Sequence, residues 1–298
     1  GAALSEAGLW QRGVALMSFM RTRRLARRLR TRVDIEAWRA ARLRRFLQSI
    51  APRVAAYRDA NARRLEDLPV MDKATLMSAF ERYNRPGVTA DEARRALEGS
   101  RRIGARSVGA STGTSGNRGF YLVSDHERFV WLGVMLAKAL PDITKVRHRV
   151  AIVLPANSRL YDSANESGRL VLSFFDLTTG IESILPKVSA FAPTVIVAPP
   201  KVLVEMARAD VPLSPRKVFS AAEVLDPADR KVIEARFGLT LGQIYMATEG
   251  LFGVSCDAGG LHLTEDCVAF EWERQDGFGD LVAPAVTDFT RTTQVMAR

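Results

Sequence analysis

Short apolar runs alternate with amphipathic stretches through the middle of the chain. The apolar runs have the length of buried strands and cover residues 150–154, 170–175, 194–198, 217–220 and 243–246. Helical spacing appears between them at 181–191, 201–209 and 227–237, and the last stretch has Pro227 in its first turn. This alternation predicts an α/β fold, with a layered parallel or mixed sheet flanked by helices.

The region before residue 100 has a different pattern. Residues 1–64 are arginine-rich and helical in spacing, with a helix expected to begin at Asp34 as its N-cap. Asp72 is expected to cap a short helix, and Thr89 with Glu92 forms a capping box that opens another. Ser124 and Glu127 form a second box, ahead of an apolar helix. From residue 260 onward the pattern is strand-like.

These patterns predict three regions. Residues 1–100 form a helical region packed on the main domain, residues 101–250 an α/β nucleotide-binding core, and residues 251–298 a β-rich end. The chain contains no internal repeat and no low-complexity linker.

Composition narrows the class of protein. Hydrophobic residues make up 47% of the 298 residues and charged residues 26%, as in ordinary globular proteins. Two cysteines are too few for a disulfide scaffold, which favours a reducing, cytoplasmic location. The apolar stretch 14–20 is too short to span a bilayer, and its positive charge follows it, the reverse of a signal peptide.

Most of the net charge of +10 lies in one segment. Between residues 21 and 45, eleven arginines face only two carboxylates, Asp34 and Glu36. A solvated helix face is the simplest interpretation, and weak contact with an anionic membrane is the alternative. The arginines are not interleaved with aromatic residues, so we expect no specific nucleic-acid partner.

The segment 111–119 has the composition of a phosphate-binding loop. It contains three glycines, four hydroxyl side chains and one arginine: Ser111, Thr112, Gly113, Thr114, Ser115, Gly116, Arg118 and Gly119. Glycines let backbone N–H groups approach an anion, while the hydroxyls and the guanidinium donate further hydrogen bonds. Because a strand is expected on each side, the loop should join a hairpin. A flexible surface loop is the alternative. The loop lacks the Lys-Ser/Thr ending of a Walker A motif.

Ser111 to Gly116 resembles the phosphate loop of the adenylate-forming superfamily of acyl-CoA synthetases, adenylation domains and luciferases. The loop departs from the usual form by lacking its proline and by having Arg118 where lysine is usual. In that variant it resembles the phenylacetate–CoA ligase-like branch.

Two further segments extend the resemblance. Residues 245–249 resemble the Tyr-Gly-x-Thr-Glu motif, which implies that Tyr245 stacks on adenine, Thr248 holds the α-phosphate and Glu249 ligates Mg²⁺. Residues 220–223 resemble a segment lining the adenine pocket, which implies adenine contacts for Ala222 and Glu223. Glu223 could equally be a carboxylate that stabilises a helix start. The acid substrate would lie near Ala221, Gly250 and Leu251.

The segment 287–298 resembles the run that approaches the hinge of these enzymes. The resemblance implies that the ribose-binding aspartate and a C-terminal lid lie beyond Arg298. The chain is therefore expected to be the large N-terminal part, with the lid absent and with activity weak or missing. Asp288 does not align with the ribose aspartate and is interpreted as structural.

The resemblance implies an ATP- and Mg²⁺-dependent ligase that converts a carboxylic acid, possibly aromatic, to an acyl-adenylate. A thiol of CoA or of a carrier protein's phosphopantetheine would then accept the acyl group. One alternative is adenylylation of a phenolic coenzyme. Another is a non-catalytic nucleotide- or partner-binding module that uses the basic N-terminus. The sequence does not indicate an oligomeric state.

Three histidines and two cysteines offer a different chemistry. His126, His148 and His262 are far apart in sequence, and none has metal-ligand spacing. Cys256 and Cys267 would need further ligands nearby to bind zinc. The three histidines are interpreted as structural or surface groups.

Overall fold

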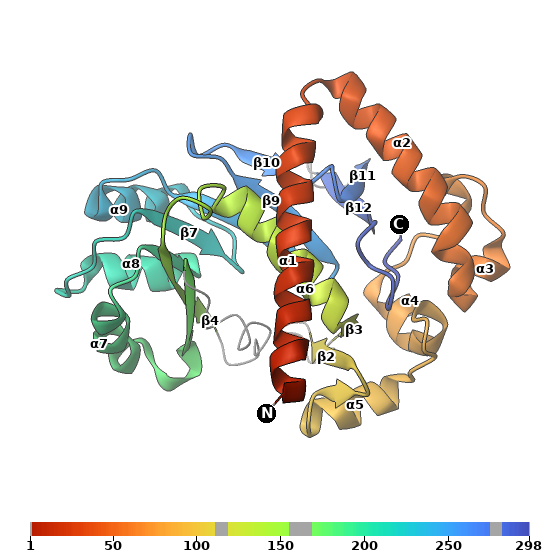
Figure 1. Ribbon diagram of the computed structural model, residues 1–298, viewed down its shortest axis with the longest axis horizontal. Helices are drawn as coiled ribbons and strands as arrows, with labels where there is room; N and C mark the ends of the chain where they lie inside the picture. The colour runs from red at the N-terminus through yellow and green to blue at the C-terminus, as the bar shows by residue number, and fades with distance from the viewer. Residues whose placement is uncertain (1, 111–118, 155–168, 275–281, 298) are drawn as a thin grey trace. The chain divides into compact units, whose positions relative to one another are not determined.

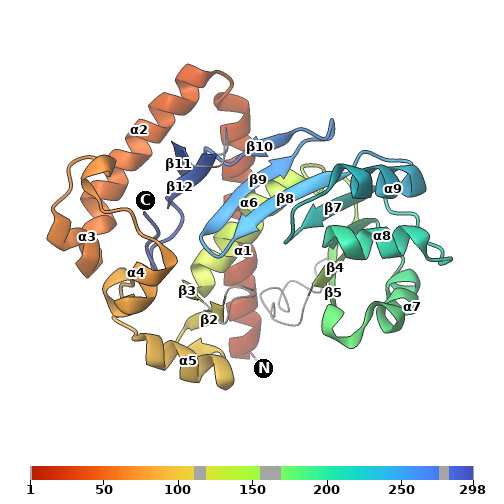
Figure 2. The same ribbon diagram turned by 180° about the vertical axis from the view of Figure 1, so that it is seen from behind.

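The computed structural model describes residues 2–110, 119–154, 169–274 and 282–297 of the chain (Figures 1 and 2). These residues form two compact units, each assembled from separate stretches of the chain. Unit 1 comprises Gly1–Gly13, Val134–Met246 and Leu251–Leu263, and unit 2 comprises Val14–Gly133, Ala247–Gly250 and Thr264–Arg298.

A seven-stranded mixed sheet lies mainly in unit 1, in the order β10-β9-β8-β7-β6-β4-β5. Its strands are β4 (His148–Leu154), β5 (Leu170–Asp176), β6 (Val195–Ala198), β7 (Lys217–Ala221), β8 (Gly242–Ala247), β9 (Gly250–Ser255) and β10 (Leu261–Leu263). Each neighbouring pair from β5 through β4, β6 and β7 to β8 is parallel, whereas β10 pairs with β9 in the antiparallel direction. The predicted α/β class is confirmed.

Three helices follow strands of this sheet and share one core with it. They are α7 (Ile181–Phe191), α8 (Pro200–Arg208) and α9 (Pro227–Phe237), and Figure 1 shows them beside β4 and β7. Ile184, Leu203 and Ile233 from the three helices are buried against Val153 and Ile196 of the strands. The helical spacing in the sequence predicts α7 and α9 at their observed bounds.

Unit 2 contains the N-terminal helices, a small sheet and the C-terminal strands. Its helices include most of α1 (Ala2–Arg28), then α2 (Arg32–Ser49), α3 (Ala55–Ala60), α4 (Lys73–Ser78), α5 (Ala90–Glu98) and the first part of α6 (Asp125–Ala139). Its strands are β1 (Arg102–Ile103), β2 (Arg106–Ala110), β3 (Phe120–Ser124), β11 (Val268–Arg274) and β12 (Val282–Asp288). Tyr57, Phe80, Leu122 and Phe289 lie in its core.

Capping residues predicted from sequence mark the starts of α4, α5 and α6 in this unit. Asp72 accepts a hydrogen bond from the Thr75 amide, and the Thr89–Glu92 box opens α5. The start of α2 differs from the prediction, because the N-cap is Thr31 and Asp34 is the N3 carboxylate of the box. Asp34 accepts hydrogen bonds from the Thr31 amide and hydroxyl, so its carboxylate marked the helix start but not the cap itself.

Gly133 lies where α6 passes close to α1. A Cβ atom at this position would come within 2.3 Å of the Ala15 carbonyl oxygen and 2.9 Å of the Phe19 nitrogen. These are backbone atoms, so they can move only if the helices separate. We expect Gly133→Ala to lower the free energy of unfolding by about 1–3 kcal/mol, as measured by urea denaturation.

Gly13 of α1 is the matched control, because a Cβ there would meet nothing within 4 Å. Gly13→Ala should leave stability unchanged or raise it by up to about 1 kcal/mol through helix propensity. Equal losses in the two variants would contradict a steric cause at Gly133.

Candidate functional site

The predicted site residues are divided between the two units. Ala221, Ala222, Glu223, Tyr245 and Leu251 belong to unit 1, whereas Gly119, Thr248, Glu249 and Gly250 belong to unit 2. Ser111, Thr112, Gly113, Thr114, Ser115, Gly116 and Arg118 lie outside the described residues.

In unit 1, the two predicted adenine segments lie at the carboxyl ends of neighbouring parallel strands. Ala221, the last residue of β7, pairs in register with Ile244 of β8, which places Ala222 and Tyr245 one step beyond that pair. The carboxyl ends of parallel strands are where ligands bind in sheets of this type. The fold thus brings together two segments that are 22 residues apart in sequence.

Both segments present groups to solvent. The Tyr245 ring is 43% exposed and makes an edge contact with Phe252, with their centroids 5.3 Å apart. Ala222 has a φ of 70°, in the left-handed region that residues with a side chain seldom adopt. Glu223 is exposed. The exposed Tyr245 ring offers an aromatic face at this strand end, on which a planar base could stack.

The predicted acid-pocket residues are more enclosed. Ala221 and Leu251 are 8% and 4% exposed, and Gly250 is buried in unit 2 at the start of β9. Sequence reasoning named these positions but gave no indication of their burial.

In unit 2, the strands that flank the glycine-rich segment pair as predicted. β2 and β3 are antiparallel, and Ala110 pairs with Phe120, so residues 111–119 connect the two strands of a hairpin. Gly109 faces the Tyr121 ring so closely that a Cβ atom would lie 2.1 Å from ring carbon Cζ. The tyrosine therefore closes over the backbone of the opposite strand just before the loop.

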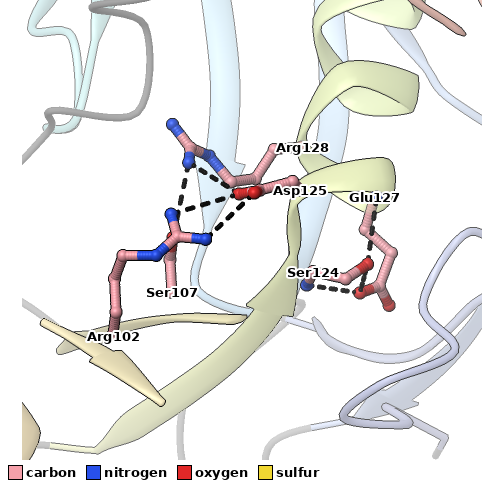
Figure 3. A network of polar contacts seen from close by, with 6 residues as sticks. All are labelled: Arg102, Ser107, Ser124, Asp125, Glu127 and Arg128. Carbon is pink, nitrogen blue, oxygen red and sulfur yellow. Dashed lines mark hydrogen bonds and ion pairs between the residues drawn. The ribbon is translucent and has the colours of Figure 1, made fainter. Parts of the chain in front are cut away.

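An ion pair joins β1 to the start of α6, and hydrogen bonds join the other end of the hairpin to the same helix (Figure 3). Asp125 accepts hydrogen bonds from Arg102 at 3.0 Å and from Arg128 at 3.2 Å, and Arg128 also donates to the Ser107 hydroxyl. Glu127 accepts from the Ser124 amide and hydroxyl, both at 2.7 Å, as the predicted capping box requires. Together these contacts hold strand β3 against the helix that follows it.

Lys73 is a candidate phosphate ligand that the sequence analysis did not identify. A Cβ atom at Gly119 would lie 3.1 Å from Lys73 Cε, which puts this side chain at the end of the glycine-rich segment. Lys73 is the first residue of α4, and nothing in its surrounding sequence marked it as a phosphate ligand.

The Thr248–Glu249 turn connects β8 to β9. The Thr248 hydroxyl donates to the Glu249 carboxylate at 3.0 Å, and the Thr248 carbonyl accepts from Arg291 at 3.4 Å. Arg291 is 1% exposed, and its guanidinium lies 5.7 Å from the centre of the Trp131 ring. The buried guanidinium of Arg291 thus stabilises the turn through this hydrogen bond. The sequence contains no local signal that predicts this contact.

A buried carboxylate accompanies this cation. Burial alone would raise the pKa of Glu127, but the charge of Arg291 and the hydrogen bonds from Ser124 and Thr293 outweigh it, so the pKa lies below its ordinary value. Asp288 is fully buried, and desolvation raises its pKa despite hydrogen bonds from Thr290.

The described residues contain no group of three or more His, Cys, Asp or Glu side chains that could hold a metal ion. A Mg²⁺ ion that binds with a nucleotide needs only one or two carboxylates, because phosphates and water supply its other ligands. Glu249 fits that requirement. In the described part of the chain, no helix combines the length and the apolar character that crossing a bilayer requires.

The chain was compared with protein-family models and with curated proteins, and neither comparison gave a match. Solved structures do match. A 2-hydroxyisobutyryl-CoA ligase in complex with 2-HIB-AMP and CoA, in the thioesterification state, aligns with a TM-score of 0.64 and 17% identity. The same ligase in the postadenylation state, with R3-HIB-AMP, aligns with a TM-score of 0.65 and 14% identity.

The chain therefore shares its fold with this CoA ligase. The first of these alignments covers 91% of this chain and 63% of the ligase, and the second covers 91% and 62%. The chain therefore spans less than two thirds of the ligase that it matches.

Proposed function

We propose that the chain binds ATP and Mg²⁺ and activates a carboxylic acid as its acyl-adenylate. One observation supports the proposal: Ala221 and Tyr245, from the two segments expected at the adenine, lie towards the carboxyl ends of neighbouring parallel strands in a fold shared with a CoA ligase. The ligase with this fold was captured with an acyl-AMP and CoA, which supports the same reaction class here. The phenylacetate–CoA ligase-like branch remains a prediction based on Arg118 and the missing proline.

In the proposed reaction, a carboxylate oxygen attacks the α-phosphorus of ATP and pyrophosphate leaves with the bond electrons. Tyr245, Ala222 and Glu223 would position the adenine, and the hydroxyls of residues 111–115 with Arg118 would bind the phosphates. The Thr248 hydroxyl would donate to the α-phosphate.

Glu249 would hold Mg²⁺, which neutralises phosphate charge when bound. A thiolate of CoA or of a carrier protein would then form the C–S bond and release AMP. Ala221, Gly250 and Leu251 would border the acid. Their apolar character suits an apolar or aromatic acid, and the proposal extends to that substrate class.

Calorimetric titration with ATP·Mg²⁺ tests the site itself. We expect the chain to bind ATP·Mg²⁺ with a millimolar or lower Kd, and a Gly116→Asp/Glu249→Ala variant to bind at least tenfold more weakly. Gly116→Asp puts a negative charge in the phosphate loop, and Glu249→Ala removes the proposed metal ligand. Far-UV circular dichroism of both proteins checks the fold. Equal binding by the two proteins would rule out this location for the nucleotide.

A further inference from the structure

A pocket in unit 2 gathers three arginines that the proposed reaction does not use. Arg21 from α1 and Arg42 and Arg45 from α2 line a concavity of about 270 Å³. Phe289, Thr290 and Thr292 from the segment after β12 line it as well. These six residues define what we call the arginine pocket, and none of them belongs to the predicted nucleotide site.

The arginine pocket concentrates positive charge without a matching carboxylate. Throughout the described residues, no ion pair joins Arg21, Arg42 or Arg45 to an acidic side chain. Arg32, at the start of the same helix α2, does have a carboxylate partner, since it pairs with Glu265 at 2.7 Å. In the same described part of the chain, Arg42 Nε is buried and has no hydrogen-bond acceptor.

Aromatic side chains hold two of these guanidinium groups in place. Arg42 lies 5.6 Å and Arg21 6.0 Å from the centre of the Trp38 ring. The Trp38 indole donates to the Asp266 carbonyl at 3.0 Å, which fixes the ring. Arg42 also lies 5.9 Å from the Phe289 ring. Cation–π contacts of this kind orient the arginines but do not neutralise their charge.

The three positive charges of the arginine pocket repel one another. Burial lowers the pKa of Arg42 below its ordinary value, and the neighbouring charges of Arg21 and Arg45 lower it further. An anion in the concavity would remove this repulsion and would supply acceptors for several guanidinium N–H groups. Arginine forks match the oxygens of a phosphate group, and threonine hydroxyls commonly donate to the same oxygens.

We propose that the arginine pocket binds a small anion through a phosphate group. At about 270 Å³, the concavity lies just below the usual size range of sites for whole cofactors. A phosphomonoester or a pyrophosphate fits this size and charge. The group could come from a soluble molecule or from the headgroup of a lipid, and the two sources share the same chemistry at the arginines.

Inorganic pyrophosphate is the soluble probe, and its effect on the melting temperature is the measurement. Relative to sodium chloride at equal ionic strength, about a hundredfold excess over Kd should raise the apparent melting temperature by roughly 5–10 °C. Arg45→Gln and Arg42→Gln should each weaken pyrophosphate binding about tenfold or more. Arg45 is exposed, so its variant remains informative if the Arg42 variant fails to fold.

Arg44→Gln is the matched control, since Arg44 is an exposed neighbour on the same helix and does not line the pocket. It should bind pyrophosphate as the unmodified chain does. An equal loss in the Arg44 and Arg45 variants would mean diffuse charge attraction and would overturn the proposal. The proposal would also be overturned if pyrophosphate had no effect beyond that of sodium chloride and the chain also failed to bind the lipid vesicles described next.

The lipid arm uses sedimentation with phosphatidylcholine vesicles, with and without phosphatidic acid. Binding that requires both phosphatidic acid and Arg45 would assign the phosphate to a lipid headgroup. The Gly116→Asp/Glu249→Ala variant separates this proposal from the proposed function. It should keep its response to pyrophosphate, and loss of the response there would place the anion at the nucleotide site instead.

Discussion

Glu127→Ala is expected to lower the free energy of unfolding of unit 2 by about 3–5 kcal/mol. The Glu127 side chain is 2% exposed and accepts hydrogen bonds from the Ser124 amide at 2.7 Å, the Thr292 amide at 2.6 Å and the Thr293 amide at 2.8 Å. Alanine would leave these donors unpaired and would remove the negative charge that interacts with buried Arg291. Urea denaturation followed by tryptophan fluorescence measures the loss.

The chain contains its own control for this prediction. Glu92 occupies the same position in the Thr89 capping box, with hydrogen bonds at 2.8 Å, but that box is exposed. Glu92→Ala should therefore cost only about 1 kcal/mol or less. Similar losses in the two variants would show that Glu127 acts only as a local cap.

The same carboxylate should make stability depend on pH. The pKa of Glu127 is lower in the folded chain than its ordinary value of 4.5, so its contribution is complete above that value and is lost as the pH falls through the folded pKa. The raised pKa of Asp288 has the opposite effect, because its contribution to stability is complete at low pH and is lost as the pH rises through the folded pKa. The Glu127 charge also helps to raise the Asp288 pKa, so Glu127→Gln removes the first contribution and weakens the second. The difference in stability between the chain and Glu127→Gln should therefore shrink in acid, where both carboxyl groups are protonated.

Glu249→Ala is expected to reduce acid-dependent pyrophosphate release by about 10²–10³-fold. The substitution removes the one carboxylate of the Thr-Glu turn, which we propose as the protein ligand of Mg²⁺. The rate would be measured with a panel of carboxylic acids that includes 2-hydroxyisobutyrate. Because the side chain is only partly buried, the variant should keep its melting temperature.

Glu223→Ala provides the contrast, because Glu223 is also a carboxylate beside a strand end but is proposed to contact adenine. This change should raise the KM for ATP and leave kcat nearly unchanged, since adenine contacts are the same in the ground state and the transition state. A large fall in kcat for Glu223→Ala with none for Glu249→Ala would reverse the two assignments.

The elements of the fold were largely predictable because their signals are local. The apolar runs that became β4 to β8 are continuous, as expected for strands covered on both faces. Capping boxes at Thr89 and Ser124 mark the starts of α5 and α6 through contacts spanning only three residues. The predicted start of α2 was wrong. Thr31 and Asp34 can each serve as a cap, and only the backbone geometry distinguishes them.

The sequence indicated which residues could form the candidate site, but it did not indicate which other side chains lie beside them. The loop and the Thr-Glu pair carry their chemistry in consecutive residues, so sequence alone could identify them. Arg291 and Lys73 carry no such signal. Arg291 reaches the Thr248 carbonyl from 43 residues away, and Lys73 lies beside Gly119 only because α4 packs near the hairpin.

The sequence by itself determined the class of fold, most helix starts and the motifs that point to nucleotide chemistry. These depend on periodicity and on contacts within a few residues, which a linear pattern retains. The tertiary structure alone decided which strand ends are neighbours, that Glu127 and Arg291 share a buried environment, and that Arg21, Arg42 and Arg45 meet without a carboxylate. Burial and long-range charge depend on how distant segments pack, and local sequence does not encode that packing in a readable form.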